Sequence, residues 1–193
     1  MAEAKGKVAS PEHSLTRMFY EEAMTPFLVL SLIMGTAGCA AVILVWRISA
    51  FGYVGLVGVS SAAMWMPYLM ALIYFNTDKG TMFTGLYKKL AYAPLPAEIP
   101  PWVKRAMVAH NNSLENFMLF ATSVIFACLM MKVPEKEVRA AAAFYFVCRT
   151  YYYIFTVAPA IFMLKTAFWC MGWGACTFIF VKGLLECKSV YDL

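Results

Sequence analysis

Residues 105–116 read Arg-Ala-Met-Val-Ala-His-Asn-Asn-Ser-Leu-Glu-Asn and open an otherwise apolar run that continues to Met131. The run is long enough to cross a bilayer as a helix. A carboxylate, a histidine and three amides are costly at such a place, and polar residues in a membrane usually turn toward partners, a cavity or a ligand. The stretch therefore predicts a polar site between membrane helices, at the level of one membrane interface.

The polar residues of this stretch share one side of the predicted helix. At helical pitch Arg105, Asn112 and Asn116 fall on one face, and Glu115 lies beside it, one turn from Asn112. This arrangement predicts that they line a common polar surface.

Arg149 lies near the middle of a later apolar run. A cation at that depth needs a carboxylate, and Glu115 is the best available partner. One interpretation is a pocket for a small anionic or zwitterionic ligand, lined by Arg105, Asn112, Glu115, Arg149 and Lys165. The alternative is a buried pair of Glu115 and Arg149 that fixes helix register, with the asparagines completing its hydrogen bonds.

Composition places the chain among integral membrane proteins. Of its 193 residues, 62% are hydrophobic and 14% are charged, whereas about a quarter are charged in an ordinary soluble domain. The net charge of +5 is spread over loops and ends, which indicates membrane topology and not nucleic-acid binding. The six cysteines show no C-x-x-C spacing, so we expect core residues and no metal site.

The pattern of apolar runs predicts an all-α membrane protein with five spans. These are Pro26–Trp46, Phe51–Phe75 with a kink at Pro67, and roughly 105–131, 138–157 and 160–183. The long loop Asn76–Lys104 has a Pro-rich section, and we expect this section to be extended and to lie on the membrane surface. The predicted organisation is a polar tail with a short interfacial helix (1–25), an additional transmembrane helix (26–47), a helical bundle (51–183) and a C-terminal tail (184–193).

The spacing of several motifs resembles the MAPEG family, the membrane-associated proteins of eicosanoid and glutathione metabolism. The motifs are Arg-x-x-x-Ala-His-x-Asn-x-x-Glu-Asn at 105–116, Arg149 with Tyr152 one turn later, Lys165-Thr166, Trp169-x-x-Gly172 and Met66-Pro67-Tyr68. The resemblance covers roughly residues 55–183 and is closest to the family's bacterial-type branch.

The resemblance implies a four-helix membrane bundle, usually assembled as a homotrimer, with glutathione bound between neighbouring subunits. Carried over by position, the residues on the glutathione side would be Arg105, Asn112, Glu115 and Arg149, with Lys165 as a further cation. The polar tail and the Pro26–Trp46 helix would then be additions to the family core.

Three positions depart from the pattern of the family's active members. Val108 stands where they commonly carry an arginine, Thr156 where they carry a tyrosine, and Lys165 where a later arginine helps to hold the thiolate. Lysine keeps the charge but loses the planar fork of arginine. Threonine is a poor replacement for a phenol beside a thiol of pKa about 8.5.

Two functions follow from these observations. The preferred one is a non-catalytic subunit of a larger membrane complex, such as an accessory subunit of a respiratory complex in the mitochondrial inner membrane. Its tail and Pro26–Trp46 helix would contact other membrane subunits. A modest excess of Lys and Arg on the amino-terminal side favours that side facing the cytosol or the mitochondrial matrix. Membrane lipids are expected to bind to the bundle.

The alternative is a glutathione transferase or peroxidase that acts on lipophilic substrates, in the endoplasmic reticulum or another organelle membrane. In that case Arg149 and Lys165 would stabilise the glutathione thiolate. Glutathione is a cofactor only under this alternative.

Overall fold

The computed structural model describes residues 29–46, 48–67, 69, 101–130, 133–158 and 162–191. The predicted interfacial helix of the tail, and residues 76–100 of the predicted loop, lie outside these ranges. Within them, the chain is made of helices and short connections, without a strand. The prediction of an all-α protein is confirmed for this part of the chain.

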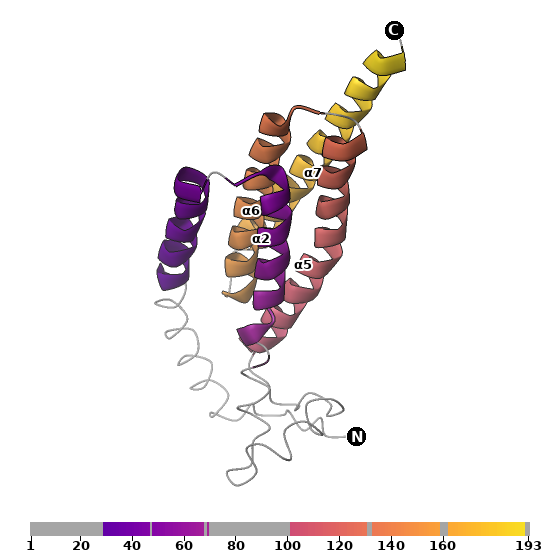
Figure 1. Cartoon of the computed structure of the whole chain (residues 1–193). Helices are drawn as coiled ribbons and strands as arrows, with labels where there is room; N and C mark the ends of the chain where they lie inside the picture. The colour runs from indigo at the N-terminus through magenta and orange to yellow at the C-terminus, as the bar shows by residue number, and fades with distance from the viewer. Residues whose placement is uncertain are drawn as a thin grey trace, which may run out of the picture.

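The helices form a bundle with one further helix beside it (Figure 1). A first helix covers 29–41 and continues as the π-helical turn η1, Val42–Trp46. The bundle consists of α2 (Ala50–Ala63), α5 (Pro101–Ile125, extended by the π-helical turn η2, Phe126–Met130), α6 (Glu135–Val157) and α7 (Phe162–Tyr191). Helices α5 and α6 contact each other, and both contact α2 and α7. They therefore hold the centre of the bundle.

Local signals explain where α2 begins and ends. The hydroxyl of Ser49 accepts a hydrogen bond from the backbone N–H of Gly52 at 3.1 Å, as an N-cap should. The regular helix ends at Ala63, four residues before Pro67. A proline ring clashes with the carbonyl four residues earlier, so Pro67 breaks the helix at this place. The regular helix is therefore interrupted next to Pro67, where the sequence predicted a kink.

Two helices extend beyond the predicted spans. Helix α5 begins at Pro101 and not after Lys104, because proline at the first helical position has the required φ and lacks an N–H that would be unsatisfied anyway. Helix α7 continues past residue 183 to Tyr191. The segment predicted as a C-terminal tail from 184 is thus helical through Tyr191.

Two of the helices have the length and composition of membrane spans. They are Pro101–Leu129 and Met163–Glu186, whereas Val29–Leu44 and Ala50–Ala63 are apolar but shorter. Many large apolar side chains on the outer faces of the helices are exposed, among them Met34, Val59, Leu129 and Met163. Lipid tails are as apolar as such side chains, so these surfaces suit a membrane.

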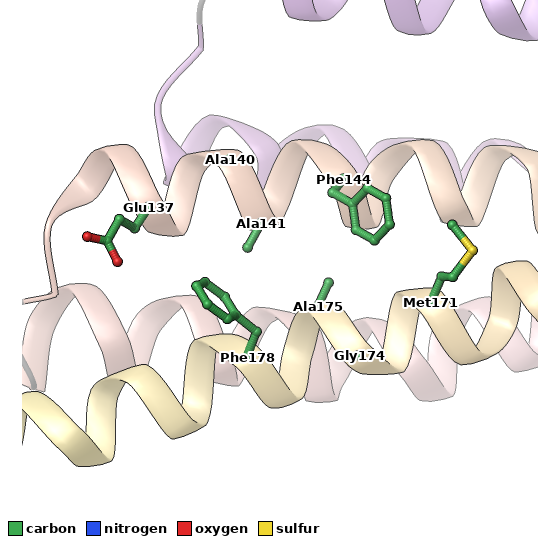
Figure 2. Close-up of a pocket in the computed structure, with 8 residues that line it drawn as sticks. All are labelled: Glu137, Ala140, Ala141, Phe144, Met171, Gly174, Ala175 and Phe178. Atoms are coloured by element: carbon green, nitrogen blue, oxygen red, sulfur yellow. The ribbon is translucent and has the colours of Figure 1, made fainter.

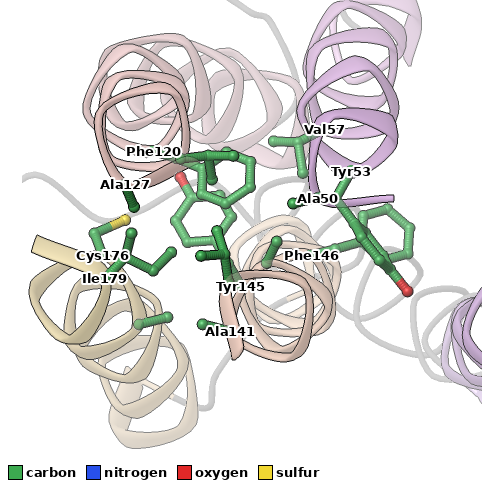
Figure 3. Close-up of a cluster of buried hydrophobic side chains, with 14 of the residues drawn as sticks. Ala50, Tyr53, Val57, Phe120, Ala127, Ala141, Tyr145, Phe146, Cys176 and Ile179 are labelled. Carbon is green, nitrogen blue, oxygen red and sulfur yellow. The ribbon is translucent and has the colours of Figure 1, made fainter. Parts of the chain in front are cut away.

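The core lies where the four bundle helices meet (Figure 3). Phe120 of α5 and Tyr145 of α6 stack at its centre, with ring centroids 4.1 Å apart and an interplanar angle of 1°. Helix α2 contributes Tyr53 and Val57, and α7 contributes Ile179. The stacked pair joins the two central helices directly beside the predicted polar stretch.

The first helix packs closely against α6. A Cβ built on Gly35 would lie 2.8 Å from the Cδ1 atom of Ile154, so a larger residue at this position would require the end of the Ile154 side chain to move. The hydroxyls of Thr36 and Tyr151 form a hydrogen bond of 2.6 Å. Cys39 is buried in the same contact and belongs to the core.

Candidate functional site

Arg149 of α6 is the central polar residue of the bundle. Only 3% of its surface is exposed. Its Nη2 donates hydrogen bonds to the Asn112 side-chain oxygen and to the Ser113 hydroxyl, each at 3.0 Å. Its guanidinium carbon lies 4.5 Å from the ring centroid of Tyr152, one turn later on α6, in cation–π contact. The guanidinium is therefore held by α5 on one side and by its own helix on the other.

The asparagines of α5 extend this arrangement. The Asn116 side-chain nitrogen donates to Oδ1 of Asn112 at 3.1 Å and to its backbone oxygen at 2.7 Å. The Tyr145 hydroxyl donates to the Asn116 backbone oxygen at 3.1 Å. We call Asn112, Ser113, Asn116 and Arg149 the Arg149 cluster. The structure thus brings Arg149 and both asparagines, three residues of the predicted polar site, into contact.

Ser113 is a member of the cluster that sequence reasoning missed. It is 1% exposed, and its hydroxyl donates to the Ala109 backbone oxygen at 2.8 Å while it accepts from Arg149. The sulfur of Met64 lies 3.2 Å from the same oxygen. Its spacing was the available signal, because Ser113 lies one turn before Asn116 on the same face of the helix.

The predicted pair of Glu115 and Arg149 is wrong for this fold. Glu115 is exposed on α5, and among the described residues the ion pairs connect Lys182 with Glu137 and Glu186. The physical reason is helical pitch: Glu115 and Ser113 are two residues apart, hence about 200° around the axis. Because Ser113 faces the core, Glu115 must point away from it.

Arg105 also lies outside the cluster. Its Nε donates to the backbone oxygen of Val157 at 2.9 Å, at the carboxyl end of α6, where the helix dipole favours a cation. Val157 is eight residues beyond Arg149, or about 12 Å along the helix axis. Arg105 thus binds the end of α6, and the structure does not bring it to Arg149.

The three positions that depart from the expected pattern are placed as follows. Val108 is 54% exposed on α5. Thr156 is buried, and its hydroxyl donates to the Tyr152 backbone oxygen at 2.7 Å. Lys165 lies in the first turn of α7 and is partly exposed. The hydroxyl that replaces the expected phenol is therefore used within its own helix.

Two further contacts bind the end of α2 to the site. His110 lies 3.0 Å from the backbone oxygen of Ser61 through Nδ1, and because a carbonyl only accepts, Nδ1 carries the proton. The Tyr153 hydroxyl donates to the Met64 backbone oxygen at 3.3 Å. His110 thus has a structural role that its place in the motif did not reveal.

The chemistry of the Arg149 cluster is that of a held cation. Asn112, Ser113 and Tyr152 are neutral groups, and within the described residues the buried Nε of Arg149 has no hydrogen-bond partner. The cluster thus holds a positive charge, and the N–H at Nε is one donor for which the described residues supply no acceptor. The described residues contain no group of three or more His, Cys, Asp or Glu that could hold a metal ion.

Most of the bundle matches a known protein family. The sequence model of the MAPEG family matches residues 54–185, more than half of the 193-residue chain. Comparisons with curated proteins and with solved structures gave no significant match. The match begins within α2 and includes the Arg149 cluster, while the first helix precedes it. Since the matched segment, the apolar helices and the polar motif agree, the chain belongs to the MAPEG family of integral membrane proteins.

Proposed function

We propose that this protein is a non-catalytic MAPEG-type subunit of a larger membrane complex. The observation that carries the proposal is that polar side chains at the predicted site bond to other groups of the bundle. Nη2 of Arg149 is bound by Asn112 and Ser113, and the Thr156 hydroxyl is bound to its own helix. In this reading the motif serves as the packing core of the bundle.

The first helix offers a surface for another membrane subunit. Its Ala37, Gly38 and Ala41 are exposed, and a Cβ built on Gly38 meets no atom within 4 Å. Small residues let two membrane helices approach closely, which favours association where the hydrophobic effect cannot. We therefore propose that a helix of a partner subunit packs here, and that the polar tail adds to this contact.

The outer face of α5 suits a second copy of the chain. Exposed residues recur on it at alternating steps of four and three, namely Lys104, Val108, Asn111, Glu115, Met118, Thr122, Ile125 and Leu129. Such a repeat is typical of a helix seam. Glu115 lies in its middle, and a carboxylate facing lipid at that depth is costly. A homo-oligomer, such as the trimer usual in the family, would cover it.

Five spans remain our proposal for the membrane topology. Helix α6 has 23 residues, or about 34 Å at 1.5 Å per residue, enough for a hydrocarbon core of about 30 Å. The distribution of Lys and Arg favours the amino terminus on the matrix side of a mitochondrial inner membrane. An accessory subunit of a respiratory complex fits this location.

One observation favours the alternative function, a glutathione transferase or peroxidase. The charge of Arg149 is compensated only by neutral groups among the described residues, and its Nε is unpartnered. A carboxylate or thiolate of glutathione is an anion that such a cation attracts. Asn112 lies beside it in the same chain. Arg105 and Glu115, which this chain does not bring to Arg149, would have to join the site from a neighbouring subunit, and Lys165 on α7 would add a further cation.

The first test is calorimetric titration of the purified protein with glutathione in mild detergent, with Arg149→Leu as control. We expect no binding, and extraction of the protein within a particle much larger than a homotrimer. Binding that Arg149→Leu abolishes, measured on an isolated homotrimer, would replace the subunit proposal with the enzyme.

A second test addresses the partner surface. Gly38→Leu should release the protein from the large particle, seen as a shift to smaller mass on gel filtration. Gly55→Leu is the matched control, because Gly55 on α2 is also exposed and its Cβ also meets no atom within 4 Å. Retention of Gly38→Leu in the large particle would contradict docking at the first helix.

A further inference from the structure

A groove of about 570 Å³ opens between α6 and α7, within the roughly 300–1,000 Å³ of small-molecule sites. Figure 2 shows the ring of Phe144 from α6 and that of Phe178 from α7 pointing into the space between the two helices. The remaining lining residues are Glu137, Ala140, Ala141, Met171, Gly174 and Ala175. Apart from Glu137 the wall is apolar.

One end of the groove carries charge. Glu137 lies in the first turn of α6, and its carboxylate accepts an ion pair from Lys182 of α7 at 3.2 Å. Lys182 also contacts Glu186 at 3.5 Å. Glu186 is the last residue of the membrane-length segment of α7. The charged end therefore lies at a membrane interface, and the groove runs from it toward the membrane interior.

The length of the groove matches one leaflet. Met171 at the inner end and Lys182 at the charged end are eleven residues apart on α7, or about 16 Å along its axis. Half of a hydrocarbon core of about 30 Å is about 15 Å. A slot bordered by two aromatic rings admits a flexible chain more readily than a second helix, which is about 10 Å wide. The shape thus fits an acyl chain that lies along the membrane normal.

The charges select among lipid head groups. Glu137, Glu186 and Lys182 place two carboxylates and one ammonium at the charged end. A head group with both an ammonium and a phosphate complements it, since the ammonium meets the carboxylates and the phosphate meets Lys182. We propose that the groove binds one acyl chain of a zwitterionic phospholipid with an ammonium head group, and that Glu137, Lys182 and Glu186 bind the head group.

Filling the groove tests the proposal. The full chain is purified in detergent with equal amounts of phosphatidylethanolamine and phosphatidylglycerol, and retained lipid is counted by native mass spectrometry. Gly174→Leu places a side chain at the groove, where the added Cβ has open space because it meets no atom within 4 Å. We expect it to lower phosphatidylethanolamine retention at least fivefold. Gly55→Leu, the same change at an open position of α2, should leave retention unchanged.

Reversing the charge separates recognition from a folding defect. In the Glu137→Lys, Glu186→Lys double variant the charged end becomes wholly cationic, so the preference should switch to phosphatidylglycerol while retention stays high. Equal retention in Gly174→Leu and Gly55→Leu, or a wild-type preference for phosphatidylglycerol, would overturn the proposal. The proposal would also be overturned if the wild-type groove held a helix of another protein and not lipid, so that Gly174→Leu released that protein.

Discussion

The bundle holds two cations in opposite ways. Arg149 lies at its centre, 3% exposed, and is bound by neutral groups of α5 and by the ring of Tyr152. Lys182 lies near the end of α7 with a side chain 31% exposed, between the carboxylates of Glu137 and Glu186. Lys182 thus has two carboxylate partners although water also solvates it, whereas the buried Arg149 has only neutral partners.

This difference indicates what each site is for. A buried charge without adequate partners is strongly destabilising, whereas an exposed ion pair contributes little. The Arg149 cluster must therefore stay intact for the fold, and its geometry is fixed by packing on α5 and α6. The Lys182 site can change partners at small cost, which suits the recognition of a head group.

The largest expected effect follows from removing a partner of Arg149 while the charge remains. Asn112→Leu should lower the free energy of unfolding by about 1.5–3 kcal/mol, because it leaves a buried guanidinium with one fewer acceptor. Arg149→Leu removes the charge itself and should cost less. The check is denaturant unfolding of both variants in detergent.

The double variant Asn112→Leu, Arg149→Leu serves as the internal control. It should be more stable than Asn112→Leu alone, because the two apolar side chains replace the whole interaction. If Asn112→Leu proved as stable as the wild type, the guanidinium would have a stronger partner than the neutral groups described above.

Arg105 gives an intermediate case, since it is half-buried and binds a single carbonyl. Arg105→Gln should lower the free energy of unfolding by about 1 kcal/mol, because it removes the hydrogen bond to Val157 and a cation at the carboxyl end of α6. Lys104→Gln, a change of the exposed neighbouring cation, is the control and should have no effect. Equal losses of unfolding free energy in the two variants would show that the effect comes from net charge and not from the hydrogen bond to Val157.

The sequence was sufficient to predict the all-α fold and the family, and it singled out Arg149 and the asparagines that the structure brings into contact. It was sufficient because Arg149 and the asparagines are so costly in an apolar run that they must meet inside. It was insufficient for Glu115, because polar residues surround α5 on several sides and only packing decides which side faces the core. The first helical turn of α5 was missed for a similar reason, since prolines suit both a loop and a helix start.

The groove between α6 and α7 had no sequence signal of its own. Ala140, Ala141, Gly174 and Ala175 read as packing residues, and small residues are common at helix contacts in membranes. Whether they close a contact or leave a groove depends on the angle at which the two helices lie. That angle is a property of the whole bundle, so it became visible only in the structure.

The smallest effect on stability is expected at Lys182. Lys182→Gln breaks both ion pairs at the end of the groove, yet the midpoint of thermal unfolding should stay within experimental error, because the group is solvated. The same variant should nevertheless retain less phosphatidylethanolamine, since the phosphate loses its cation. A clear fall in the unfolding midpoint would place Lys182 with Arg149 as a cation needed for the fold. An unchanged midpoint with weaker lipid retention would show that the two sites have different roles, with the Arg149 cluster needed for the fold and Lys182 needed for lipid binding.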